Sequence, residues 1–400
     1  MKQPLRIALR ITAAASLLAA ASAQAVDWGG YLRAGPGATK KDASRACYGL
    51  NGDGLKYRLG NECDFYGEFA LSQGFKADGV EYKALLMTNL YSNATDTGGG
   101  STDTDKLDHS KLGINQMYVE GKGYDIAPDT TFWAGKRFHG RADVHIVDTF
   151  FVNLSGVGAG IDTPTGGGKV AFSYFKTDES STNSGNRLNL DAYDFAVNPG
   201  GKLRVVATAV QANFTGGKSG FGLTLQHNQD NIFGLGGGNT LWVQYAQGSA
   251  GLNGNFGTLA AADGQKSWRI VESFTWQQGP FGGQALALWQ QDKSNVPGSK
   301  VDSATIGGRA SYALTKNFKF VTEAGYSQKK PEGQPTAKLA KLTLAPTLST
   351  GPGFWNRPEL RLYVTTAKWN SAATTQGAPG GAFANDRTGT SFGAQVEMWF

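Results

Sequence analysis

The sequence is poor in residues that bind metals and in charge of one sign. Its 400 residues include only 4 His and 2 Cys, which leaves little material for metal sites. The formal net charge is +6, and Lys2, Arg6 and Arg10 supply three of those charges, so the remainder carries +6 − 3 = +3. A charge this small and dispersed is not typical of a nucleic-acid-binding protein, and we expect no nucleic-acid partner.

Long hydrophobic runs are also missing after the first 25 residues. Those 25 residues have basic positions, a short apolar stretch from Ile11 to Ala21 and an A-x-A site at Ala23–Ala25. This pattern is typical of a cleaved secretory signal, and the apolar stretch is too short to span a bilayer. We therefore expect a signal peptide at 1–25 and one mature domain at 26–400.

The remaining sequence is rich in glycine and aromatic residues, with 56 Gly, 22 Phe, 14 Tyr and 9 Trp. Glycine suits frequent turns, and aromatic residues suit strands and membrane interfaces. Apolar and polar residues alternate in segments of about 8 to 12 residues, separated by turn-forming residues. This composition predicts an all-β protein.

The last segment shows the alternation most clearly. One face carries Phe392, Ala394, Val396, Met398 and Phe400, whereas the other carries Gln395, Glu397 and Trp399. Other apolar faces follow the same period: Phe65, Phe69 and Leu71; Tyr193, Phe195 and Val197; Phe221, Leu223 and Leu225; and Leu360, Leu362 and Val364. We expect these faces to contact lipid.

A soluble sandwich would alternate in the same way, but two features favour a membrane barrel. The alternation covers nearly the whole chain after residue 25, and aromatic residues gather near strand ends, as at Phe132, Trp133, Trp268 and Trp369. A sheet in lipid must close, because open edges leave backbone groups unpaired. We therefore predict a transmembrane antiparallel β-barrel, and its final Phe400 is typical of outer-membrane barrels.

Polar, glycine-rich stretches mark the expected loops and turns. Asn198–Gly201 is expected to be a tight periplasmic turn. Long extracellular loops are expected at 96–105, 178–186, 250–263 and 371–386. Cys47 and Cys63 should pair in an exported protein, and a bridge closing this loop contributes about 3 kcal/mol in the chain-entropy model.

Several blocks, in order along the chain, resemble the maltoporin family. They are 26–33 (VDWGGYLR), 56–63 (KYRLGNEC), 133–138 (WAGKRF), 143–148 (DVHIVD), 155–160 (SGVGAG), 357–369 and 392–399. The resemblance implies an eighteen-stranded barrel in the outer membrane of a Gram-negative bacterium. It also implies a homotrimer, a constriction loop at Arg141–Gly160 folded into the pore, and passive diffusion of maltose and maltodextrins.

The resemblance also implies which residues meet the sugar. An aromatic path would include Tyr31, Tyr66, Trp355 and Trp399, with Trp242 as a further candidate, since it shares a face with Gln244. A polar track would include Arg33, Arg58, Glu68, Arg141, Asp143 and Asp148. Aromatic rings stack on the apolar faces of a pyranose, and charged groups bind its hydroxyls. Alternation independently places Tyr31 with Arg33, Tyr66 with Glu68, and Trp399 with Glu397.

Departures from the family pattern concern the constriction. Phe150 stands where the family has a tyrosine, Asn153 replaces an aspartate and Asn115 replaces an arginine, while Thr102–Asn115 contains no aromatic residue. These changes make the constriction less polar and less charged, which weakens the preference for maltodextrins and leaves sucrose, another small sugar or a broader range of sugars open as the cargo. A general or ion-selective porin with little sugar specificity is the alternative.

Two other classes of function receive little support. A barrel enzyme would need a Ser–His pair at the wall, and His227 is the one candidate histidine, better explained as a residue at the membrane boundary. His139, Asp143 and His145 could suggest a metal site, but within the loop resemblance they shape the loop. We expect no enzymatic activity, no cofactor and no metal, and the expected partners are an oligosaccharide, membrane lipid and further copies of the chain.

Overall fold

The computed structural model describes residues 26–43, 46–52, 55–93, 111–177 and 183–400. The predicted signal peptide at 1–25 and the predicted loop at 96–105 lie outside these ranges, as does most of the loop predicted at 178–186. Within the described ranges the chain is nearly all β, as predicted. None of the helices in these ranges is both long and apolar enough to cross a membrane.

The strands of the described residues follow one another along the chain in two halves. The first half contains β1 (Asp27–Ala34), β2 (Gly37–Thr39), β3 (Asp64–Ala77), β4 (Val80–Asn93), β5 (Lys111–Tyr124), β6 (Ala127–Arg137), β7 (Ala142–Val144), β8 (Thr149–Val152), β9 (Gly156–Thr165), β10 (Gly168–Lys176) and β11 (Gly185–Asn198). The second half contains β12 (Gly201–Ala212), β13 (Gly220–Asp230), β14 (Gly238–Gln247), β15 (Lys266–Gln278), β16 (Phe281–Lys293), β17 (Val301–Ala313), β18 (Phe318–Pro331), β19 (Ala337–Ser349), β20 (Glu359–Trp369) and β21 (Thr388–Trp399).

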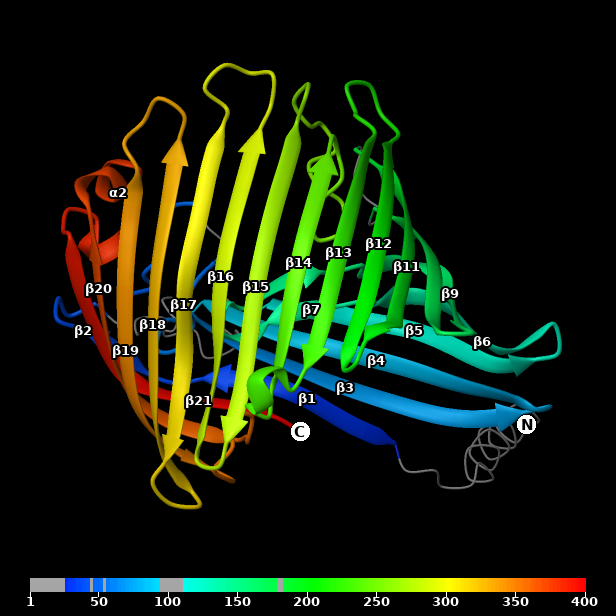
Figure 1. Cartoon of the computed structure of the whole chain (residues 1–400), viewed down its shortest axis with the longest axis horizontal. Helices are drawn as coiled ribbons and strands as arrows, with labels where there is room; N and C mark the ends of the chain where they lie inside the picture. Colours follow the sequence, from blue (N-terminus) through cyan, green and yellow to red (C-terminus); the bar gives the residue numbers. More distant parts are fainter. Residues whose placement is uncertain (1–25, 44–45, 53–54, 94–110, 178–182) are drawn as a thin grey trace, which may run out of the picture.

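All strands except β7 and β8 form one antiparallel sheet that closes on itself (Figure 1). Closure occurs because β1 pairs with both β3 and β21. β2 also pairs with β21, so β1 and β2 are two pieces of one interrupted strand. Counting them together, the described residues form eighteen strands, and the predicted barrel is confirmed.

The two ends of the barrel differ in the length of their connections. Pro199 and Gly200 join β11 to β12 as a two-residue turn, which confirms the turn predicted at 198–201. The opposite end carries the long connections 248–265 and 370–387, of which the second holds α2 (Ser371–Thr375) and the 3-10 helix η3 (Gly381–Phe383) (Figure 1). In outer-membrane barrels the longer loops face outward and the short turns face the periplasm.

The barrel is apolar outside and polar inside. On β20, Leu362 is 63% exposed on the outer face, whereas its neighbour Arg361 is 3% exposed on the inner face. The same alternation leaves Phe221, Leu223 and Leu225 exposed and buries Thr224 and Gln226. Lipid replaces water around the outer residues, so the exposed apolar surface matches the predicted membrane-facing sides.

The prediction that Tyr193 faces lipid is wrong. Tyr193 was expected to lie beside Phe195 and Val197 on the outer face, but the register of β11 against β12 shifts between Ala192 and Phe195. Asp194 adopts a left-handed conformation with φ of 64°, as in a β-bulge that adds one residue to the strand. Tyr193 continues the inward face of Asn189 and Asp191, and the extra residue places Phe195 on the outer face, so the two rings lie on opposite sides of the wall.

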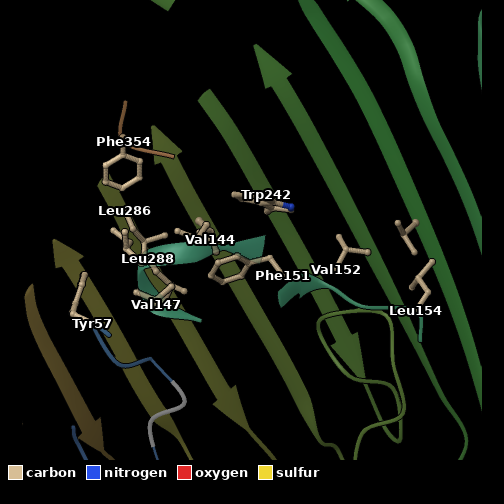
Figure 2. Close-up of a cluster of buried hydrophobic side chains, with 13 residues drawn as sticks. Tyr57, Val144, Val147, Phe151, Val152, Leu154, Trp242, Leu286, Leu288 and Phe354 are labelled. Atoms are coloured by element: carbon tan, nitrogen blue, oxygen red, sulfur yellow. The ribbon is translucent and has the colours of Figure 1, made fainter. Parts of the chain in front are cut away.

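In the described ranges, three segments fold inward from the wall: 138–155, 46–63 and 250–255. The last meets the inner wall where Asn189 Nδ2 donates to Gly254 O at 2.9 Å and Gln244 Nε2 donates to Leu252 O at 2.8 Å. The first, 138–155, is here called the inward loop and contains β7, the 3-10 helix η1 (His145–Val147) and β8. Figure 2 shows Val144, Phe151 and Val152 of this loop lying over the inner face of the strands. Its backbone is held by Gln284, which accepts from Ile146 N, and by Gln244, which donates to Phe151 O. A loop ending at Gly160 was predicted; instead Gly156 begins β9, because it already pairs with Arg137.

The second inward segment is 46–63, of which residues 46–52 and 55–63 are described. The predicted disulfide between Cys47 and Cys63 is present, with the two sulfurs 2.05 Å apart. Tyr57 Oη lies 2.9 Å from Thr305 Oγ1, and Lys341 Nζ donates to Leu59 O at 2.9 Å. The bridge thus anchors a segment that packs against the inner wall of β17–β20, which the sequence analysis did not anticipate.

Candidate functional site

Five rings form a row on the lumen side, here called the aromatic row: Tyr66, Tyr31, Trp399, His145 and Trp355. The centroids of Tyr66 and Tyr31 are 6.2 Å apart, and Tyr31 is the ladder partner of Trp399. His145 lies 5.8 Å from Trp399 and 5.5 Å from Trp355. Four of the five predicted stacking residues are thus brought together, and His145 joins them unpredicted.

The row is produced by three neighbouring strands and two connections. Tyr66, Tyr31 and Trp399 come from β3, β1 and β21, where alternation turns them inward. Trp355 comes from the turn between β19 and β20, and His145 begins η1. Trp399 is 37% exposed and Trp355 is 42% exposed, so both rings present surface in the absence of any ligand.

The tyrosine hydroxyls are held by hydrogen bonds. Tyr31 Oη donates to Glu397 Oε1 at 3.0 Å and accepts from Arg58. Tyr66 Oη donates to Glu68 Oε1 at 2.6 Å, and Asn115 Nδ2 donates to the same carboxylate at 2.7 Å. These bonds fix the ring planes, and a guanidinium lies over each ring: Arg33 Cζ is 5.2 Å from the Tyr66 centroid and Arg58 Cζ is 5.9 Å from the Tyr31 centroid.

Arg33, Arg58 and Asp148 of the predicted polar track are bound to one another. Arg33 Nη1 and Arg58 Nη1 lie 3.0 and 3.5 Å from the Asp148 carboxylate. Arg58 Nε also donates to Glu62 at 2.6 Å. Burial acts to raise the pKa of Glu62, but Arg58, Arg33 and Lys56 outweigh it and lower that pKa to about 2. This part of the track therefore serves to hold the loops.

Arg141 and Asp143 are the exposed charges of the inward loop. The Arg141 guanidinium lies between two phenyl rings, 4.0 Å from the centroid of Phe138 and 3.9 Å from that of Phe150. Both side chains reach the lumen, but the surrounding protein partly desolvates them, which lowers the pKa of Arg141 and raises that of Asp143. Phe150, at the position where the family has a tyrosine, thus positions a cation by cation–π contact.

Trp242 occupies the lumen side, as predicted, but it is not available for stacking. Its ring is 3% exposed and lies 5.2 Å from the ring of Phe151 (Figure 2). The inward loop covers it, and it belongs to the apolar cluster that attaches the loop to β14–β16. We therefore correct its expected role from sugar contact to loop attachment.

Sequence reasoning missed a network of buried ion pairs on the inner wall of β17–β21. Its members are Arg309, Lys319, Glu323, Lys341, Arg357, Glu359, Arg361 and Glu397. Glu323, for example, lies 2.7 Å from Arg309 Nη2 and 3.0 Å from Lys341 Nζ. A single charged residue between apolar neighbours, as at Arg361, indicates an inward-facing charge. Its ion-pair partners lie on other strands, so the sequence pattern does not identify them.

His145 connects this network to the aromatic row. Its Nε2 lies 3.6 Å from Glu397 and 3.4 Å from Arg357 Nη2. Burial lowers the pKa of His145 to about 4, although Glu397 acts in the opposite direction. The ring is therefore neutral near pH 7. In the described ranges, no group of three or more His, Cys, Asp or Glu side chains is arranged to hold a metal ion.

Several solved structures have a similar fold. The structure resembles OccAB1 of Acinetobacter baumannii, with a TM-score of 0.53 and 11% identity over 94% of this chain and 96% of the other. A BenF-like porin of Pseudomonas fluorescens Pf-5 gives a TM-score of 0.53 and 11% identity over 94% and 99%. OpdQ of Pseudomonas aeruginosa gives 0.50 and 8% over 94% and 99%. At these identities the likeness concerns the fold.

The family itself is given by the sequence match. The family model of the LamB porins matches residues 26–400, which is the entire barrel together with the inward segments. Members of this family are channel proteins. The chain therefore belongs to the LamB porin family and is a multi-pass β-barrel of the outer membrane.

Proposed function

We propose that this porin conducts carbohydrate by facilitated diffusion along the aromatic row. The observation that carries the proposal is the row itself, which combines ring faces open to the lumen with hydroxyl-binding groups beside them. Maltose, maltodextrins or related oligosaccharides fit this chemistry, because a pyranose has apolar faces and a rim of hydroxyls.

The spacing of the rings suits passage rather than tight binding. Neighbouring centroids in the measured pairs lie between 5.5 and 6.2 Å apart, so a sugar leaving one ring meets the next. A row of similar weak sites recruits a ligand and still releases it, which is what conduction requires. No energy source is needed, since the sugar follows its concentration gradient.

The constriction supports selection among sugars. Arg141, Asp143 and Glu68 supply donors and acceptors next to the row, while Phe150 offers a ring without a hydroxyl. A donor–acceptor pair suits hydroxyl groups, whereas a ring of one charge would suit ions. The reduced polarity at Phe150 and Asn153 leaves sucrose and maltodextrins as the two cargo classes to compare.

Liposome swelling tests the proposal. Vesicles containing the porin should swell faster in maltose, maltodextrins or sucrose than in a sugar-free osmolyte of similar size. Equal rates set only by molecular size would identify a general porin and remove the carbohydrate proposal.

We also propose that the chain acts as a channel without enzymatic activity and that it assembles as a homotrimer in lipid. The trimer follows from the maltoporin resemblance. Its contacts must differ from the family pattern, because Thr102–Asn115 supplies no aromatic residue to a neighbouring subunit. Mass measurement of the detergent-extracted protein, with and without heating, tests the trimer.

A further inference from the structure

A polar cavity of about 650 Å³ opens in the lumen on strands that do not contribute to the aromatic row. Its walls are the inner faces of β5, β6 and β9–β12, and its roof is Phe138–Arg141 at the start of the inward loop. We call this cavity the chamber. Its volume lies within the range of small-molecule sites, and none of the five rings of the row lines it.

Tyr193 of β11 gives the chamber an aromatic wall. Its side chain continues the inward face of Asn189 and Asp191, and the bulge at Asp194 follows directly after it. Two cations fix its position: Lys169 Nζ lies 5.7 Å and Arg204 Cζ lies 5.9 Å from the ring centroid. The ring offers a flat apolar surface in a cavity lined mainly by charged side chains.

Beside this ring, three buried polar atoms lack a hydrogen-bond partner in the described part of the chain: Arg137 Nη1, His139 Nε2 and Asp162 Oδ2. Arg137 Nη1 is 3.6 Å from Asp162 Oδ2, and His139 Nε2 is 3.8 Å from Asp162 Oδ1, both beyond hydrogen-bonding distance. His139 is 7% exposed. Unpaired buried groups are costly, and a ligand hydroxyl, which both donates and accepts, would satisfy them.

The remaining lining is held in place and nearly balanced in charge. Arg204 Nε donates to Asp191 at 2.8 Å, and Arg204 Nη2 donates to Gly140 O at 2.8 Å, which ties the loop to the wall. Five basic and four acidic side chains line the chamber. A fixed, balanced lining favours a neutral polyhydroxylated ligand over an ion of either sign.

We propose that the chamber is a second carbohydrate site, separate from the aromatic row, in which one sugar ring stacks on Tyr193 and bonds Arg137, His139 and Asp162. This inference rests on the proposed function, because it takes sugar to be the cargo. Arg141 lines the chamber and also lies at the constriction, so a sugar can pass between the two sites.

The test is the fall in ion current that glucose and maltotriose cause in planar bilayers, measured for wild type, Tyr193→Ala, Tyr193→Phe and the matched control Phe195→Ala. Phe195 lies two residues away on the lipid side of the same strand. Loss of the stacking surface should weaken sugar binding in Tyr193→Ala by about threefold to tenfold. Tyr193→Phe, which keeps the ring, should stay within about twofold of wild type, and Phe195→Ala should match wild type.

Asp162→Asn keeps the shape of the chamber and replaces Tyr193→Ala in the experiment if that variant does not assemble. About threefold weaker sugar binding is expected for Asp162→Asn. Unchanged sugar block in Tyr193→Ala or Asp162→Asn, with wild type blocked, would overturn the chamber site and leave the aromatic row intact. An equal loss in Phe195→Ala would also overturn it, because the effect would then be general. The absence of block in wild type would instead remove the proposed function.

Discussion

The two sides of the lumen differ in how their charges are satisfied. On the β17–β21 side, buried ion pairs such as Arg309–Glu323 and Lys319–Glu359 bind the strands to one another, and further charges hold the inward segments. On the β5–β12 side, Arg204–Asp191 and Arg137–Glu120 are also paired, but Arg137 Nη1, His139 Nε2 and Asp162 Oδ2 at the chamber make no hydrogen bond in the described part of the chain. The charged groups of the first side hold the constriction in place, whereas polar groups on the second side remain able to bind a ligand.

The largest expected effect on stability comes from removing one member of the buried ion-pair network of β17–β21. Glu323→Ala leaves Arg309 and Lys341 without their shared carboxylate in a buried setting, and it also removes the acceptor of Leu59 N. A loss of about 3–5 kcal/mol in the free energy of unfolding is expected. Urea unfolding in lipid vesicles, followed by tryptophan fluorescence, measures it.

The matched control is Asp162→Ala in the chamber, where the ion-pair partners Arg137 and His139 lie at 3.6 and 3.8 Å and the Asp162 side chain is 18% exposed. Its expected loss is at most about 1 kcal/mol. Equal losses in the two variants would show that the two sides do not differ in the way described.

A second effect concerns pH and the inward loop. The pKa of His145 is about 4 in the packed loop, against about 6.5 when the loop is free. Protonation of His145 therefore favours release of the inward loop. The contribution of His145 to the free energy of unfolding is complete above about pH 6.5 and declines by up to about 3 kcal/mol as the pH falls toward 4. Glu62, whose pKa is lowered to about 2, stays ionised through this range.

Comparing wild type with His145→Gln isolates this contribution, since glutamine does not titrate. Between pH 7 and pH 4.5 the wild type should lose more unfolding free energy than the variant. Parallel pH curves for the two proteins would exclude His145 as the source.

A smaller effect is expected on the aromatic row. Trp399→Ala and Tyr66→Ala each remove one stacking face, and each should weaken maltotriose block by about threefold to tenfold. The control Phe392→Ala removes a ring from the lipid side of β21 and should leave block unchanged. Unaltered block in both row variants would show that the sugar does not follow the row.

The smallest effect is expected at the constriction. Phe150→Tyr adds a hydroxyl next to Arg141 while keeping the ring that contacts the guanidinium. One additional hydrogen bond to a sugar should strengthen maltotriose block by about twofold to fivefold. The sugar titration in planar bilayers measures this, and weaker block than in wild type would contradict it.

Much of the wall could be predicted from the sequence. Alternation with period two reports which face of each strand meets lipid, and it places Tyr31, Tyr66 and Trp399 on the inner face without knowledge of their partners. Export predicts the pairing of Cys47 with Cys63. These inferences depend on local pattern, which is why they survive in the structure.

The features that were missed depend on non-local register. One left-handed residue, Asp194, puts Phe195 on the opposite side of the wall from Tyr193, and no composition signal marks the bulge. Trp242 shares the inner face with Gln244, but only the path of the inward loop decides that it is covered. The ion pairs of Glu323 likewise join residues that are adjacent only after β17, β18 and β19 align.

The central claim is that the aromatic row binds sugar, and the most direct measurement is the ion current through the wild-type porin in planar bilayers as maltotriose or sucrose is added. The current should fall with sugar concentration and saturate, as expected when a bound sugar occupies the constriction. A current that does not respond to either sugar would contradict the claim and identify a general porin.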